Sequence, residues 1–313
     1  MLRSLNSGVS AMQQFQQRMD VIGNNIANVN TTGFKGARID FADAFSQTVG
    51  SGSASGSMQI GTGVGTNAVS NQFRQGAVTS TGVTTDLAVS GNGFFAVRDN
   101  LTDADYVTRD GSFHLDNSGH LVTADGFRVQ GYSDSQLTTR GDIVIDATDM
   151  QATRVAAATT ARDAAAAALA GDPTNTTLQE SLATAEAELT TAQNLKMASF
   201  SINSEGKINV RLNDGTEYVR GQVLLQNFQN PQALTKEGSN LFSGMTSAGP
   251  LADISAPGTN GLGSVKSGSL EMSNVDLANE FSSLITTQRA FQASARIITT
   301  SDEILQELVN LKR

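Results

Sequence analysis

Both ends of the sequence carry apolar residues at a seven-residue interval, the spacing of helices that pack along one seam. Near the C-terminus one row runs unbroken and a second row, four residues on, is partly filled: Leu277, Leu284, Phe291, Ile298 and Leu305, then Phe281, Ala295 and Val309. Near the N-terminus the two rows are Leu5, Met12, Met19 and Ile26, then Phe15, Ile22 and Val29. Two such rows form one apolar stripe on a helix. The sequence therefore predicts a long amphipathic helix at each end.

The C-terminal helix is expected over residues 274–313, because Asn274 can cap its start and Asp276 and Glu280 favour its first turns. Gln288 and Asp302 interrupt the second apolar row. Two such helices can lie on an ordinary globular core, or they can pair with each other or with neighbouring molecules. Helices at both termini with a β-like region between them favour assembly. We therefore expect these apolar rows to form an assembly interface.

Composition limits the classes of function. A net charge of −9 argues against nucleic-acid binding, which requires a basic face. Cysteine is absent, which excludes disulfides, thiolate metal sites and cysteine nucleophiles. No run of 18 apolar residues is present, so no membrane span is expected, and residues 1–30 contain no apolar core typical of a signal peptide.

The region between the helices is predicted to be an all-β domain, formed by residues 76–149 and 198–250. Short apolar runs separated by turn signals such as Asp110-Gly111 and Asp125-Gly126 indicate a sandwich or open barrel, and the first of these signals also predicts a short hairpin. Residues 35–75 and 251–273 are expected to be linkers or extended segments. Within them, the Gly- and Ser-rich composition of 50–66 predicts flexibility unless neighbouring elements order it.

Residues 150–197 interrupt the β pattern with two stretches of helical periodicity. Apolar residues share one face of each stretch, and Gly171-Asp172-Pro173 separates the two; the faces are Val155, Ala158, Ala165 and Leu169, then Leu178, Leu182, Ala185, Leu189 and Ala192. This pattern predicts an αα-hairpin inserted into the β domain. The expected fold class is therefore α+β, with a terminal helical domain formed by 1–34 and 274–313.

The sequence offers no recognisable catalytic or cofactor site. Gly91-Asn92-Gly93 lacks the third glycine and the following helix of a dinucleotide loop, so it is interpreted as a turn. His114 and His120 flank a turn without a cluster of carboxylates, which makes a metal site a poor interpretation. We therefore expect neither an enzyme nor a bound metal or cofactor.

Several motifs closely resemble those of bacterial flagellar rod and hook proteins. The N-terminal run Met19–Lys35 resembles the family signature, and Ser273–Phe281 together with Gln288–Phe291 resembles the C-terminal one. Internal runs are similar as well: Gln59–Val64, Gln75-Gly76, Asp86–Val89, Gly91–Phe95 and Glu237–Phe242. The resemblance covers both ends and most of the β region, and it excludes residues 150–197.

The resemblance implies a structural subunit that polymerises into a helical tube, with the terminal helices as an inner coiled coil and the β domain outside. It implies export through the flagellar type III apparatus without a cleaved signal peptide, and a location in the extracellular flagellum. The implied partners are further copies of the chain, the distal rod protein, and the hook cap and hook–filament junction proteins.

Three functions remain as alternatives. The opening Met1–Leu5, the ending Val309–Arg313 and the chain length favour a subunit of the flagellar hook, a curved tube that transmits torque. Because distal rod proteins carry an extra stretch where this chain has residues 46–58, the alternative is a subunit of the straight rod. The third, from another class, is an adhesive or carbohydrate-binding β protein. The inserted hairpin would either touch neighbours along the tube or decorate its surface passively.

Overall fold

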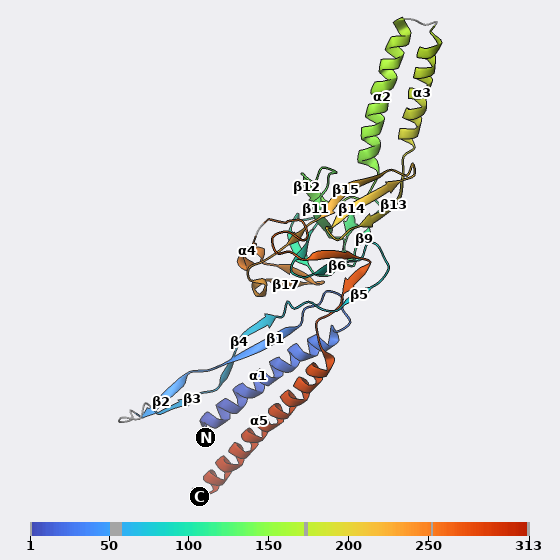
Figure 1. The fold of residues 1–313 in the computed structure, drawn as a ribbon. Helices are drawn as coiled ribbons and strands as arrows, with labels where there is room; N and C mark the ends of the chain where they lie inside the picture. Colours follow the sequence, from blue (N-terminus) through green and yellow to red (C-terminus); the bar gives the residue numbers. More distant parts are fainter. Residues whose placement is uncertain (1, 51–57, 172–174, 252, 312–313) are drawn as a thin grey trace. The chain divides into compact units, whose positions relative to one another are not determined.

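The computed structural model describes residues 2–50, 58–171, 175–251 and 253–311 (Figure 1). The chain divides into two compact units, which we call the terminal unit (Met1–Ala77 with Glu271–Arg313) and the central unit (Val78–Leu270). The terminal unit therefore combines the two ends of the sequence. The described residues include no helix with the length and apolar character needed to cross a membrane.

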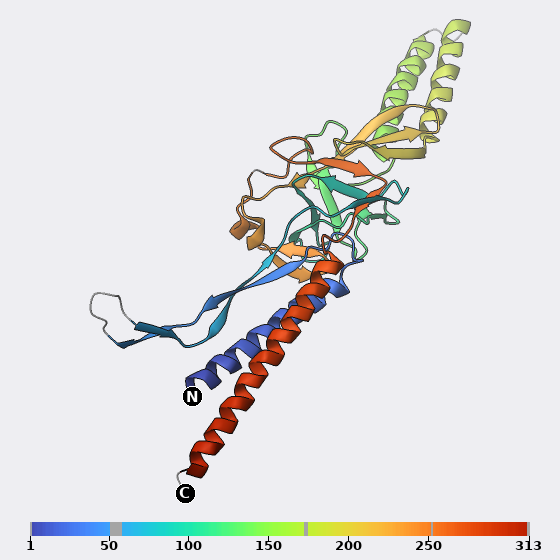
Figure 2. The same cartoon turned by 60° about the horizontal axis from the view of Figure 1, so that its bottom comes forward.

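The terminal unit is built on two long helices, α1 (Leu2–Ala27) and α5 (Leu277–Leu311). Both views show them side by side along the full length of α1 (Figures 1 and 2). Asp276 caps α5 by accepting hydrogen bonds from the amides of Ala278 and Asn279. The predicted terminal helices are thus confirmed, but the predicted cap Asn274 is wrong, because α5 begins at Leu277 and Asn274 bonds Gly36 and Gln72 instead.

A β-ribbon follows α1 in the same unit. Strand β1 (Ala37–Asp43) pairs antiparallel with β4 (Val64–Asn71), and β2 (Ser46–Gly50) continues the ribbon by pairing with β3 (Met58–Gly61). Of the segment 50–66, for which composition predicts flexibility, residues 51–57 lie outside the described residues. The described remainder is ordered, because strand pairing and α1 satisfy its backbone groups.

The central unit contains an open sheet of twelve described strands. Its path runs β13-β14-β15-β11-β7-β8-β18-β17, with β10, β12 and β16 attached to strands of this path and β9 attached to β10, while β6 pairs with β19 and β5 with β20. The bounds are β5 Val78–Ser80, β6 Leu87–Ser90, β7 Phe94–Arg98, β8 Asp105–Thr108, β9 His114–Leu115, β10 Leu121–Val122, β11 Arg128–Tyr132, β12 Arg140–Asp142, β13 Met197–Ile202, β14 Lys207–Leu212, β15 Glu217–Val223, β16 Leu225–Gln226, β17 Thr235–Gly238, β18 Leu241–Ser243, β19 Ser264–Ser267 and β20 Ser269–Glu271. Two short helical turns, η1 (Pro231–Ala233) and α4 (Met245–Ala248), lie between strands. The predicted α+β class is confirmed, and the pairing of the described strands does not close the sheet into a barrel.

The core of the central unit forms on the faces of these strands. In β14, Ile208, Val210 and Leu212 are buried while the residues between them are more exposed, as the two-residue period of a strand requires. The rings of Phe95 and Phe113 meet edge to face at 5.1 Å between centroids. This packing makes the central unit a folded body in its own right.

One predicted hairpin is wrong. Asp110-Gly111 does not join two paired strands, because β8 pairs with β7 and β18 while β9 pairs with β10. The backbone of Gly111 instead accepts a hydrogen bond from the Leu87 amide at 3.0 Å. A side chain at Gly111 would overlap the Leu87 carbonyl, so this glycine permits a close crossing of the chain rather than a turn.

The predicted αα-hairpin is confirmed as α2 (Thr148–Gly171) and α3 (Thr176–Gln193). Ala158, Ala185 and Ala192 are buried between the helices, as their sequence spacing predicts. At its base, Arg154 pairs with Asp214, so that the hairpin is tied to the turn between β14 and β15. The hairpin therefore continues from the edge of the sheet in the central unit (Figure 1).

Candidate assembly site: the helical pair and its junction

The seam between α1 and α5 is narrow and lined by small residues. Thr287, Ser294 and Ser301 repeat every seven residues along α5 and are only 3%, 6% and 7% exposed. Opposite them, Gly8 of α1 is buried, and a side chain there would come within 3.1 Å of Ile298 Cγ1. The hydroxyls of Ser4 and Ser301 lie 3.4 Å apart at the N-terminal end of α1. The two helices therefore approach closely, as small residues at a helix contact permit.

The predicted interface residues fall into three groups. Ile22 is buried, and ten others are half-buried along or beside the seam: Leu5, Met12, Phe15, Met19, Ile26, Val29, Leu284, Phe291, Ile298 and Leu305. Leu277, Phe281 and Val309 are 40%, 50% and 64% exposed. In the single chain the predicted stripe is thus partly covered by the partner helix, and part of it remains open for a contact with another molecule.

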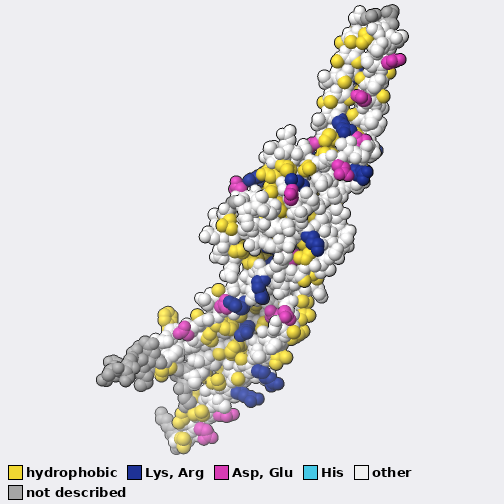
Figure 3. Space-filling model, viewed as in Figure 1, with side chains coloured by type: hydrophobic (Ala, Val, Ile, Leu, Met, Phe, Trp, Pro, Cys, Tyr) yellow, Lys and Arg dark blue, Asp and Glu magenta, His cyan; other side chains and the backbone are white. Residues whose placement is uncertain are grey.

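The heptad pattern misses two features of the helical pair. The row Thr287, Ser294 and Ser301 is not apolar, so a search for hydrophobic periodicity passes over it; its seven-residue spacing is the signal that would have found it. Further large apolar side chains outside the two predicted rows are also exposed: Ile285, Ile297, Ile304, Leu308 and Leu311. Figure 3 shows hydrophobic side chains along this edge of α5, with basic groups near its middle and acidic groups near its end.

A buried ion pair holds the two ends of the chain together where the helices meet the rest of the unit. Lys35 Nζ lies 2.6 Å from Glu271 Oε1, and both side chains are fully buried. Glu271 Oε1 also accepts a hydrogen bond from the Gly76 amide at 2.8 Å. The backbone amide of Gly33 donates to the Glu271 carbonyl. Residues 33–35 and Gly76 therefore both bind Glu271, which is distant from them in sequence.

Two asparagines complete this junction. Asn25, 3% exposed, bonds both the amide and the carbonyl of Ala37 and donates to Glu280 Oε1 at 3.1 Å. Asn274 accepts from the Gly36 amide at 2.9 Å and donates to the Gln72 carbonyl at 2.6 Å. These side chains satisfy the backbone between helix and strand, so they fix the angle at which α1 leads into β1.

The β-ribbon packs on a different face of α1 from the one that meets α5. Ser10 Oγ accepts a hydrogen bond from the Val64 amide at 3.5 Å, and the Thr66 hydroxyl bonds the side-chain oxygens of Gln14 and Gln17. Three polar residues on this face of α1 therefore bind the ribbon, although Gln17 remains exposed.

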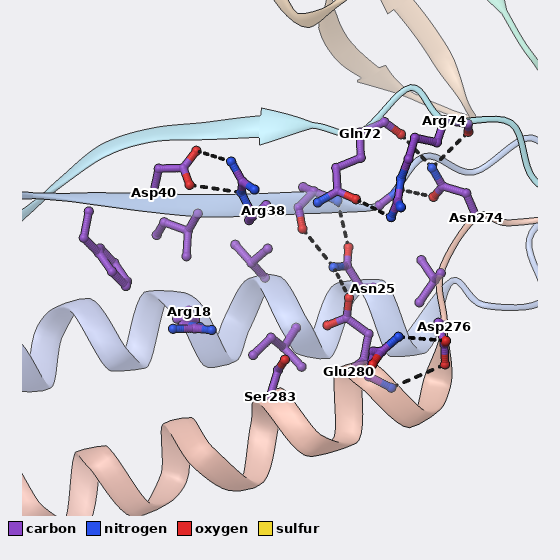
Figure 4. Close-up of a pocket in the computed structure, with 18 residues that line it drawn as sticks. Arg18, Asn25, Arg38, Asp40, Gln72, Arg74, Asn274, Asp276, Glu280 and Ser283 are labelled. Atoms are coloured by element: carbon purple, nitrogen blue, oxygen red, sulfur yellow. Dashed lines mark hydrogen bonds and ion pairs between the residues drawn. The ribbon is translucent and has the colours of Figure 1, made fainter.

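A pocket of about 650 Å³ lies between α1, β1 and the start of α5 (Figure 4). Its walls carry both signs of charge, including Arg18, Arg38, Asp40 and Glu280. Arg38 pairs with Asp40 at 3.0 Å, whereas Arg18 has no ion-pair partner within the described residues. We call this cavity the junction pocket.

The arrangement is suited to binding. In the part of the chain that the structure describes, no three His, Asp or Glu side chains are placed to hold a metal ion. What the terminal unit presents is a pair of close-packed helices with open apolar faces and a pocket at one end. These are the features of a subunit that associates with other molecules through its helices.

Comparison with known families agrees with this class. The model described as flagella basal body rod protein matches residues 5–35, the one described as flagellar basal body rod FlgEFG protein C-terminal matches 266–311, and the one described as flagellar hook protein FlgE/F/G D1 domain matches 88–161. The first two cover most of α1 and all of α5 and include the junction residues Lys35 and Glu271.

Full-length relatives agree as well. The chain is 41% identical over 320 residues to flagellar basal-body rod protein FlgG of Bacillus subtilis, with all of both chains covered. It is 32% identical over 324 residues to FlgG of Borreliella burgdorferi and 30% identical over 448 residues to the flagellar hook protein FlgE of the same organism, again with full coverage. The chain therefore belongs to the bacterial flagellar basal-body rod and hook protein family, whose members are structural components of the flagellum.

Proposed function

We propose that this chain is a subunit of the distal rod of the flagellar basal body, the straight drive shaft of the motor. The observation that carries the proposal is the 41% identity to a rod protein over the full length of both chains. The sequence alone favoured the hook, and the relatives favour the rod, which was the alternative.

The lengths of the alignments support the same choice. Alignments with the two rod proteins extend over 320 and 324 positions for a chain of 313 residues. The alignments with hook proteins of Borreliella burgdorferi and Treponema pallidum extend over 448 and 466 positions. Those hook proteins therefore carry long segments that this chain lacks.

In this proposal the terminal unit is the assembly element. The exposed apolar residues of α5, among them Phe281, Ile285 and Leu308, would be covered by neighbouring copies, which contributes about 25 cal/mol for each Å² of apolar surface removed from water. The partners are further copies of this chain, hook subunits at the end of the rod, and the flagellar export apparatus. The chain would reach the flagellum without a cleaved signal peptide and would act as a mechanical part rather than as an enzyme.

Electron microscopy of polymers formed by the purified chain tests this function. We expect straight, stiff tubes with an axial channel when the protein is concentrated in high salt. Curved or supercoiled tubes would instead favour the hook, to which the chain is related at 30% identity. A monomer at all concentrations, even with rod fragments added as seeds, would contradict a polymer of either kind.

A further inference from the structure

Helix α5 is longer than its partner and continues past the N-terminal end of α1. The hydroxyl of Ser4, close to the start of α1, meets Ser301, and α5 extends ten residues further to Leu311. We call residues 302–311 the α5 extension. Ile304, Leu308 and Leu311 are 51%, 49% and 80% exposed on it. Their spacing of four and three residues places them on one face, which nothing in the described terminal unit covers.

Carboxylates flank this apolar face. Glu303 and Glu307 are one helical turn apart, are exposed, and have no cation within ion-pair distance among the described residues. Asp302 accepts a hydrogen bond from Gln306 at 3.0 Å. Lys312 and Arg313 follow in the sequence, outside the described residues. The described extension is therefore an amphipathic helix end with negative charge beside an open apolar stripe.

The junction pocket has the complementary chemistry. Its carboxylates are already engaged: Asp40 with Arg38, Asp276 with the first amides of α5, and Glu280 with Asn25. Arg18 is a half-buried residue that lines the same pocket, and it has no ion-pair partner among the described residues. A half-buried cation with no partner favours an anion supplied from outside.

The walls of the pocket also provide apolar surface. Val21 on α1, Phe41 on β1 and Val275 just before α5 line it and are half-buried. A volume of about 650 Å³ holds several side chains, so the pocket can accept the edge of a helix. An amphipathic helix in such a groove is bound through residues spaced three and four apart, the spacing that the extension offers.

We propose that the junction pocket of one copy receives the α5 extension of a second copy, with Glu303 or Glu307 paired to Arg18. The apolar residues Ile304 and Leu308 then pack on the pocket walls. This contact rests on the proposed function, since it is the site at which successive subunits of the polymer join. It identifies the α5 extension and the junction pocket as the two surfaces that meet there.

The placement of the two surfaces determines what the contact builds. Pocket and extension lie at opposite ends of the same helical pair, so a chain cannot fill its own pocket. Such a head-to-tail contact joins two different surfaces, and repeated copies form a ring or an open helical filament rather than a symmetric dimer. The α5 extension of each copy then occupies the junction pocket of the next copy along the polymer.

Cross-linking between single-cysteine variants tests the joint directly, because the natural chain contains no cysteine. Variants Arg18→Cys and Glu307→Cys are mixed, polymerised and treated with a short bismaleimide, so that any heterodimer joins two different chains. We expect rapid formation of the Arg18–Glu307 dimer. The control mixture pairs Glu307→Cys with Gln13→Cys, an exposed position on another face of α1, and should react far more slowly.

Equal rates in the two mixtures would overturn the proposal. So would faster reaction of Glu307→Cys with Arg289→Cys, because this would place the extension against the middle of the neighbouring α5. A wild-type protein that forms no polymer would contradict the proposed function. A wild-type polymer without the expected cross-link would contradict only this joint.

Charge reversal supplies a second measurement. Arg18→Glu should raise the protein concentration needed for polymerisation about tenfold at low salt, and less at high salt, because the contact is electrostatic. Combining Arg18→Glu with Glu303→Arg and Glu307→Arg should restore most of the loss. The matched control Arg162→Glu, on exposed helix α2, should leave polymerisation unchanged. Failure of the triple variant to recover, with its circular dichroism spectrum intact, would overturn the pairing.

Discussion

Lys35 and Glu271 form the one ion pair of the described chain in which both side chains are fully buried, so the stability of the terminal unit depends on their remaining paired. Glu271→Gln removes the carboxylate that pairs with the buried Lys35 ammonium. We expect the free energy of unfolding of the terminal unit to fall by about 3–5 kcal/mol, measured by urea titration followed by circular dichroism.

The surface pair Arg98–Asp105, whose side chains are 40% and 50% exposed, is the matched control. Removing it by Arg98→Ala should cost less than about 1 kcal/mol, because exposed pairs are screened by water. Equal losses for the two variants would contradict the buried character of the junction.

Two glycines of α1 should respond in opposite ways to a side chain. A side chain at Gly8 would press on Ile298, whereas one at Gly23 would meet no atom within 4 Å. Gly23→Ala should therefore stabilise the helix by about 0.5–1 kcal/mol, and Gly8→Leu should separate α1 from α5. Thermal unfolding of the two variants measures the difference. A stable Gly8→Leu variant would show that the close approach of the helices is not required.

The central unit should lose stability in acid through Asp146. Burial raises the pKa of this carboxyl, but hydrogen bonds from Thr148 and Arg220 outweigh burial and hold the pKa below its usual range. Because the folded pKa is depressed, the contribution is present at neutral pH and is lost as the pH falls below about 4. Unfolding measured between pH 7 and pH 3 should be less pH-dependent in Asp146→Asn. Asp125→Asn, on an exposed turn, is the control and should behave like wild type.

At the scale of elements, the helical hairpin α2–α3 should be separable from the sheet. Its two ends lie together, since Gln151 Nε2 donates to the Gln193 carbonyl at 2.6 Å, and the core residues Ile145 and Leu195 lie outside it. Replacing residues 152–192 by a short Gly-Ser linker should leave the sheet folded, with only a small loss of stability from the surface pair at Arg154.

Urea titration of the central-unit transition checks this expectation. Leu195→Ala is the contrasting variant, because truncating a buried leucine costs about 2–5 kcal/mol. An excised chain that unfolds as readily as Leu195→Ala would show that the hairpin is part of the core.

Elements were easier to predict from the sequence than the contacts between them. Heptad spacing predicted α1 and α5, and helical periodicity with Gly171 predicted the hairpin, because these signals are local. Strand pairing was less accessible: β6 pairs with β19, about 180 residues away, and no local pattern specifies such a partner. The ion pair between Lys35 and Glu271 could not be predicted either, because no local sequence pattern distinguishes these two residues from other charged residues.

The apolar residues of the candidate site were largely predictable, and its polar residues were not. Apolar periodicity pointed to Ile22 and Ile298, but it passed over Thr287 and Ser294, which are buried in the seam. The junction pocket arises from three segments that meet only in the folded unit. Arg18, which has no ion-pair partner among the described residues, has nothing in the sequence to distinguish it from other arginines.

At the scale of the whole molecule, the terminal unit should change most when the polymer forms. Two helices with exposed apolar faces gain much of their stability from tertiary packing rather than from helix propensity. In the monomer we expect faster amide exchange over residues 5–29 than over strand β14, and stronger protection of the same amides in the polymer. Strand β14 of the central unit is the internal reference and should be protected in both states. Strongly protected amides over 5–29 in the monomer would contradict this expectation.

The terminal unit is made from the first and last parts of the chain, with Ser4 meeting Ser301 across almost the whole sequence. During synthesis the central unit can fold before α5 exists, whereas the helical pair must wait for the final residues. A prematurely ended chain therefore has a folded centre but no complete means of attachment. A copy that ends before α5 is made lacks both the complete junction pocket and the α5 extension. Such a copy cannot take part in the proposed contact.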